Sequence, residues 1–93
     1  MELKDTARMM QSADYKERFK AEYYQTKIRY EKLKKFNTKI EAALGMRECG
    51  KENVEIPKHD CPEGLLREQQ RVMGEYLHLL ELRACIENIE LDS

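Results

Sequence analysis

Apolar and small side chains recur in alternating steps of four and three along the first half of the chain. The series is Phe19, Tyr23, Thr26, Tyr30, Leu33, Asn37, Ile40 and Leu44. This spacing lines one face of an α-helix. Asp14 and Glu17 form a capping-box pattern at its start, and Gly45 suits the residue after its end. We therefore predict a helix over residues 14–44, about 46 Å long at roughly 1.5 Å per residue.

The second half carries two neighbouring apolar lines. Pro62 suits a first helical position, with Asp60 or Cys61 as the cap, so we predict a second helix over residues 62–90. One line consists of Leu66, Met73, Leu77, Leu80, Ala84 and Leu91, and the other of Leu65, Val72, Tyr76, Leu79, Ile86 and Ile89. Because the apolar surface is wider than one seam, one line can face the first helix and the other a second subunit.

The remaining segments complete the expected architecture. Residues 45–61 contain two glycines, a proline and mixed charge, which predicts a loop that is long for a helix hairpin. Residues 1–13 form an N-terminal extension, read as a short helix with a bend near residues 12–14. The fold class is thus all-α: one domain over residues 1–93, built as an antiparallel two-helix hairpin with a short N-terminal helix.

Composition points to assembly of several copies. The chain has 93 residues, of which 38% are charged, so its core must be thin. A thin two-helix core is marginally stable alone, and we expect a homo-oligomer. No run of about 18 apolar residues predicts a membrane span. The first residues lack an apolar signal segment, and the three cysteines are an odd number, so we expect a cytoplasmic protein with reduced thiols.

The net charge of −1 hides a division between the halves. Residues 1–44 hold 11 Lys and Arg against 7 Asp and Glu, a balance of +4, whereas residues 45–93 hold 6 against 11, a balance of −5. Opposite charges suit an antiparallel hairpin, so we expect the two halves to pair with each other.

Signatures of enzymes and metal sites are missing from the sequence. It contains no glycine-rich phosphate loop, no nucleophile elbow and no HExxH motif. The spacing of Cys49, His59 and Cys61 matches no standard zinc pattern. We therefore expect a protein that is not an enzyme and needs neither metal nor cofactor.

One cluster of residues suggests binding chemistry. Cations and aromatic rings alternate at the start of the first long helix, at Tyr15, Lys16, Arg18, Lys20, Tyr23, Tyr24 and Lys27. Arg and Lys bind phosphate, and aromatic rings stack on bases. The cluster is either a ligand site for an anion with a flat ring or a solvated cationic face with core tyrosines. Arg83 would lie alongside it, either paired with Glu22 or reaching a ligand.

Both long segments resemble the small phage and prophage proteins described as crAss-phage-related. The matching positions are Tyr15 to Phe19, Tyr30 to Leu33, Cys61-Pro62, Leu65-Leu66, Gln69 or Gln70, Met73, Tyr76-Leu77, Leu80-Glu81, Arg83-Ala84 and Ile86-Glu87. The resemblance covers about two thirds of the chain and implies phage origin, hence the host cytoplasm, without implying an activity.

A second resemblance is architectural. Phage helical-hairpin oligomers that inhibit CBASS or Thoeris defence by sequestering immune nucleotides are similar in size and shape. Our first hypothesis is therefore an anti-defence sponge that binds a nucleotide-derived signal, of the cyclic nucleotide or ADP-ribose type. The alternative is a non-enzymatic adaptor that docks a host or phage protein on its exposed apolar helix face. Binding of nucleic acid ranks third, because the chain is slightly acidic and has no known DNA-binding motif.

Overall fold

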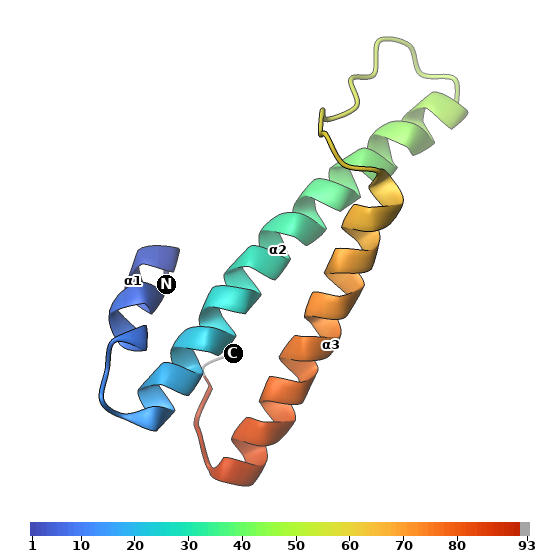
Figure 1. The fold of residues 1–93 in the computed structure, drawn as a ribbon. Coiled ribbons are helices and arrows are strands. Elements are labelled where there is room, and N and C mark those ends of the chain that lie inside the picture. Colours follow the sequence, from blue (N-terminus) through green and yellow to red (C-terminus); the bar gives the residue numbers. More distant parts are fainter. Residues whose placement is uncertain (92–93) are drawn as a thin grey trace.

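The computed structural model describes residues 1–91 and contains three helices in this range: α1 (Leu3–Met10), α2 (Tyr15–Glu48) and α3 (Glu63–Glu87). Helices α2 and α3 lie side by side and antiparallel, and α1 folds back along the other side of α2 (Figure 1). The molecule measures 54 × 25 × 22 Å, with a radius of gyration of 17.0 Å. A compact domain of this length would have a radius of gyration near 12 Å, so the predicted hairpin is elongated.

The start of α2 follows the predicted cap. The Asp14 side chain accepts a hydrogen bond from the backbone N–H of Lys16, at 3.0 Å. This bond satisfies one of the amide groups that a helix start leaves without a partner. The predicted bend is also present: α1 ends at Met10, and α2 begins at Tyr15.

Three predicted helix boundaries are wrong by a few residues. Helix α2 continues through Gly45 to Glu48, and Gly50, at φ +82°, takes the left-handed conformation instead. Glycine inside a helix costs only about 1 kcal/mol, which the additional turn offsets. Helix α3 starts at Glu63 with Pro62 as its cap residue, and no side chain caps it. It ends at Glu87 because Asn88, at φ 60°, turns the chain back.

The main core lies where the start of α2 meets the end of α3. Its buried members are Phe19, Tyr23, Tyr24, Leu77, Leu80, Ala84 and Ile89, with Met9 and Leu91 packed against them. The turn at Asn88 is what lets Ile89 enter this core, at 5% exposure. Three separate segments, namely α1, the hairpin and the chain after α3, therefore close over one end of the molecule (Figure 1).

The other half of the hairpin is held by a polar contact and a close approach. Asn37 is buried and donates hydrogen bonds to the Leu66 carbonyl oxygen (3.2 Å) and to Gln70 Oε1 (2.9 Å). Gly74 faces Tyr30: a Cβ there would lie 3.3 Å from Cε1 of that ring. The glycine thus lets the tyrosine ring pack directly against the α3 backbone.

Candidate functional site

The predicted site residues all lie at the core end of the hairpin, where α2 begins and α3 ends. Tyr15 and Arg83, which are 68 positions apart in sequence, are in direct contact: Nη2 of Arg83 donates to the tyrosine hydroxyl at 2.7 Å. The antiparallel packing of the two helices brings them together (Figure 1). The sequence-based expectation that Arg83 lies beside the start of the first long helix is therefore confirmed.

Glu87 completes a triangle with these two side chains. The Tyr15 hydroxyl donates to Glu87 Oε1 at 2.8 Å, and Arg83 Nε donates to Glu87 Oε2 at 3.0 Å. The hydrogen bond with Glu87 is the main reason why the pKa of Tyr15 is raised, and the same bond lowers the pKa of Glu87. The Arg83 guanidinium also lies 5.1 Å from the centre of the Phe19 ring, within the range of a cation–π contact.

The lysines and the arginine of the predicted cluster have no carboxylate partner in residues 1–91. Lys16 Nζ donates to the carbonyl oxygen of Asn88 at 3.3 Å, and Arg18 Nη1 donates to that of Ser12 at 2.9 Å. No ion pair of the described residues joins residues 1–44 to residues 45–91, because the acidic groups of α3 pair within α3. The expected ion pairing between the halves is therefore wrong, and the positive charge of α2 stays unneutralised.

Tyrosine–glutamate hydrogen bonds link the two long helices instead. Tyr23 donates to Glu81 at 2.7 Å, and Tyr76 donates to Glu22. Burial, followed by the bond to Glu81, raises the pKa of Tyr23 from 10.0 to about 12. In both pairs a neutral phenol donates to a charged carboxylate, which gives a stronger bond than one between two neutral groups.

The structure distributes the predicted tyrosines between two environments. Tyr15 is 46% exposed, whereas Tyr23 and Tyr24 are 3% and 9% exposed and pack edge to face with ring centres 5.4 Å apart. Lys27 Nζ lies 5.7 Å from the centre of the Tyr23 ring. Because Tyr23 and Tyr24 are buried in this arrangement, Tyr15 is the one of the three predicted tyrosines whose ring is open to a stacking ligand. Lys20 is half-buried and has no hydrogen bond or ion pair among the described contacts.

Sequence reasoning did not assign Tyr76 to this cluster. Its ring is 38% exposed. The hydrogen bond with Glu22, followed by burial, raises the pKa of Tyr76, and the positive charge of Arg83 opposes this shift. The signal was the spacing of seven residues between Tyr76 and Arg83, which is two helical turns and places both side chains on one side of α3. The hydrophobic pattern predicts Tyr76 only as part of an apolar line.

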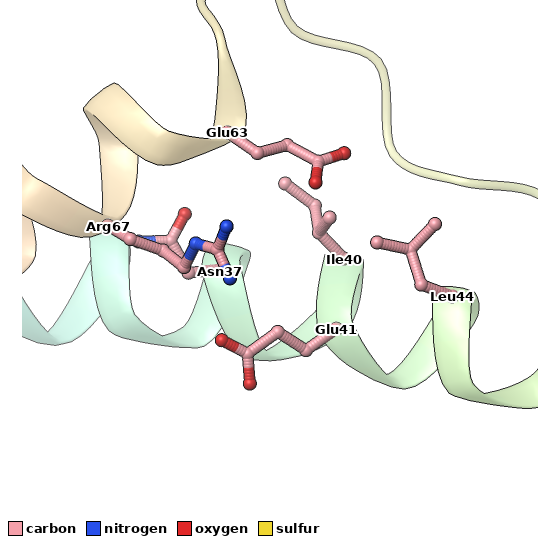
Figure 2. A pocket seen from close by; sticks show the side chains of 6 residues that line it. All are labelled: Asn37, Ile40, Glu41, Leu44, Glu63 and Arg67. Atoms are coloured by element: carbon pink, nitrogen blue, oxygen red, sulfur yellow. The ribbon is translucent and has the colours of Figure 1, made fainter.

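Two of the hollows that the described residues form elsewhere offer little to an anionic ligand. Figure 2 shows the first, between the end of α2 and the start of α3, lined by Asn37, Ile40, Glu41, Leu44, Glu63 and Arg67. Its volume of ≈ 20 Å³ is the space of about one water molecule. The second is an open hollow of ≈ 650 Å³ beside Gly74. Its arginine, Arg71, is already paired with Glu68 and Glu75.

The core-end cluster offers hydrogen-bond donors, positive charge and one open aromatic ring. This combination suits a ligand that carries both phosphate and a planar base. Within residues 1–91, no group of three or more His, Cys, Asp or Glu side chains is placed to hold a metal ion. Nor does this range contain a helix with the length and apolar character needed to cross a membrane.

Comparison with protein families identified one relationship. The model of the Sequestin family matches residues 13–86, which begins after α1 and includes α2 and nearly all of α3. The family's name denotes sequestration, in agreement with the expected sequestering role. Comparison with curated proteins found no match, and comparison with solved structures found none either.

Proposed function

The chain belongs to the Sequestin family, and we propose that it is a phage-encoded anti-defence protein that sequesters a nucleotide-derived immune signal. The signal would be of the cyclic nucleotide or ADP-ribose type, because both combine phosphate groups with a flat base. Sequestration means that the protein binds the molecule and releases it chemically unchanged.

One observation carries the proposal: cations without a carboxylate partner follow an exposed tyrosine at the start of α2. Lys16 and Arg18 donate only to backbone carbonyl oxygens, which carry no net charge. Tyr15, the first residue of the same helix, is nearly half exposed and is in contact with Arg83. A phosphate would replace these weak contacts with charge-assisted hydrogen bonds, which are about twice as strong as bonds between neutral groups.

The residues of the cluster would divide the work of binding. Lys16, Arg18 and Lys20 would hold phosphates, and the ring of Tyr15 would stack on the base. Arg83 would turn one N–H group from Tyr15 to the ligand while Nε stays bonded to Glu87. The site would be supported by residues that do not touch the ligand but hold α2 against α3, namely Tyr23, Tyr24 and Lys27.

The same cluster gives no support to catalysis. The carboxylate in contact with Tyr15 and Arg83 is Glu87, and that side chain already accepts from both of them. Its pKa is lowered from the ordinary value by these bonds, which makes it a poor proton donor near neutral pH. The cluster therefore favours binding of a ligand over its conversion.

Calorimetry with defined probes tests the proposal. We expect saturable binding of 3′,3′-cyclic GMP–AMP or of cyclic ADP-ribose, with the nucleotide recovered unchanged after the protein is denatured. Arg83→Gln should weaken binding more than about tenfold, since a hydrogen bond to a charged group contributes roughly 1.5–3 kcal/mol. Arg71→Gln is the matched control, because the two arginine side chains are 53% and 55% exposed and both pair with glutamate.

Two results would contradict sequestration. One is the absence of binding for cyclic dinucleotides and for ADP-ribose derivatives alike. The other is recovery of a cleaved nucleotide, which would indicate an enzyme. If Arg71→Gln and Arg83→Gln weakened nucleotide binding equally, the proposed site at Arg83 would be wrong, although the protein would still bind the nucleotide.

The second candidate function is a non-enzymatic adaptor for a host or phage protein. The observation in its favour is the apolar side of α3, which the fold leaves exposed along the whole helix. This function predicts that purification recovers one other protein at equal stoichiometry and that no nucleotide is bound.

A further inference from the structure

Helix α3 carries a continuous row of exposed apolar side chains, here called the α3 stripe. The exposed fractions are Leu65 58%, Val72 48%, Tyr76 38%, Leu79 57%, Leu82 47% and Ile86 83%. The other line of this helix is buried against α2, with Leu77, Leu80 and Ala84 at 7%, 1% and 2%. The two lines expected from the sequence therefore have different environments within α3, although Ile89 of the second line follows the helix and enters the core.

The stripe is comparable in area with the largest apolar patch of a typical monomer, and such patches are often functional. Together the six side chains expose on the order of 500 Å² of mainly apolar surface, which is within the roughly 300–600 Å² of the largest patch on typical monomers. If two such surfaces met, they would bury about 1,000 Å², near the lower limit for specific interfaces. Neighbouring polar side chains would add to that area.

We propose that the α3 stripe binds the α3 stripe of a second copy of this chain, with the two helices antiparallel. Leu65, Val72, Leu79 and Ile86 follow one another at intervals of seven. Reversing one helix therefore superimposes the row on itself. Leu65 then meets Ile86 of the second copy, Val72 meets Leu79, and the two Tyr76 rings lie beside the two-fold axis.

The charges on α3 select the antiparallel direction. With this register, Glu68 of each copy lies opposite Arg83 of the other, so that two pairs of opposite charge would form at the interface in exchange for the pairs with Arg71 and Glu87 within each chain. A parallel arrangement would place Glu68 against Glu68 and Arg83 against Arg83. Like charges that face each other across a helix pair are unfavourable, so the parallel dimer is disfavoured.

A second copy offers no better surface for the stripe than the stripe itself. Among the described residues of α2, the large apolar side chains with high exposure are Tyr15 and Met46, at 46% and 42%. They lie at opposite ends of that helix and cannot form a row. The pairing is thus isologous, with the same patch on both copies, which is the commonest form of a dimer.

The dimer and the proposed nucleotide site are separate inferences with a shared location. Arg83 lies between Leu79 and Ile86 on α3, so the start of α3 from the second copy would lie beside Tyr15 and Arg83. The proposal of a dimer is argued from α3 and does not depend on nucleotide binding. Its test can therefore fail while nucleotide binding persists, and the reverse is equally possible.

Sedimentation equilibrium on the full chain tests the dimer. We expect the unmodified protein to be a dimer, and Val72→Glu with Leu79→Glu to weaken dimerisation by more than about a hundredfold, because each copy would bury two unpaired carboxylates. Cys85→Glu, at an exposed position outside the stripe, should leave the dimer intact. A monomeric unmodified protein would overturn the proposal, even if a lysate supplied a different protein that binds the stripe.

Disulfide trapping tests the direction of the helices, and it does so even if the double variant fails to fold. In a background with the three cysteines changed to serine, Tyr76→Cys should cross-link two copies readily. Ile86→Cys alone should not, because the two positions would be about 30 Å apart at 1.5 Å per residue, whereas Leu65→Cys combined with Ile86→Cys should. Cross-linking through Ile86→Cys alone would overturn the antiparallel arrangement.

Discussion

Single tyrosines determine how this hairpin responds to alkaline pH. Tyr23 is buried, donates to Glu81, and has its pKa raised from 10.0 to about 12. A raised pKa in the folded chain means that the protonated phenol favours folding. The stabilisation is complete below the unfolded pKa of about 10, and it disappears as pH rises through about 12.

Tyr23→Phe should therefore flatten the alkaline part of the stability profile. The unmodified protein should lose on the order of 2 kcal/mol more than the variant between pH 10 and pH 12, given about 1.4 kcal/mol per pKa unit. Urea unfolding at a series of pH values measures this. Glu81→Gln should reduce the slope in the same direction, since it replaces a charged acceptor with a neutral one. Parallel profiles for all three proteins would refute this assignment.

Asn37 is the buried polar contact that fixes the register of the two long helices. Asn37→Ala would leave Gln70 Oε1 and one acceptor site of the Leu66 carbonyl without their partner. We expect the free energy of unfolding to fall by about 1–3 kcal/mol. Thr38→Ala is the control, because its exposed hydroxyl bonds only to the Lys34 carbonyl oxygen in its own helix. Equal effects of the two changes in urea unfolding would argue against a special role for Asn37.

The long elements could be predicted from the sequence because their signals are local. The spacing from Phe19 to Leu44 indicated α2, and the cap at Asp14 is present. Gly45 misled the prediction of its end, because the penalty of one glycine is smaller than the gain from another helical turn. The end of α3 depended on Ile89, which enters the core only when the whole end of the molecule has assembled.

The site was harder to predict because the same side chains serve core and surface. Periodicity placed Tyr15, Tyr23 and Tyr24 on one helix, but it could not tell which rings the neighbouring elements cover. Tyr24 is covered because α1 and the chain after α3 close over the hairpin. The partners of the cations could not be predicted either, because the charge balance of the two halves does not show that glutamates of α3 pair with arginines of their own helix.

Helix α1 is an additional element that packs on a defined part of α2. Ala21 has 0% exposure although it lies outside the row that faces α3, and Thr6 of α1 also has 0% exposure. Since α1 is the other helix in contact with α2, it must cover Ala21. The family match begins at residue 13, so α1 precedes the matched part of this chain.

Ala21→Lys should detach α1 and leave the hairpin folded. A lysine has no room beneath a helix that buries alanine completely, and a buried unpaired charge is costly. We expect trypsin to cleave after Arg8 at least tenfold faster, with little loss of helix by circular dichroism. Ala42→Lys, at an exposed position of the same helix, should cleave like the unmodified protein. Unchanged cleavage of Ala21→Lys would contradict this packing.

At the scale of the whole molecule, the fold presents two surfaces with different chemistry that adjoin at Arg83. One is the end of the hairpin, where Arg83 contacts Tyr15 and where Lys16 and Arg18 bond only to backbone carbonyl oxygens. The other is the α3 stripe, an apolar surface that suits a second copy. A protein that acts by binding alone needs only such surfaces, because its effect depends on affinity and abundance.

Native mass spectrometry tests sequestration most directly. The protein would be incubated with extract from cells whose nucleotide-signalling defence has been triggered, and then with extract from untriggered cells. We predict a dimer that carries the added mass of a nucleotide only after the first incubation, and an Arg83→Gln dimer that carries none. A protein of unchanged mass in both extracts, at concentrations where the signal is in excess, would contradict the account.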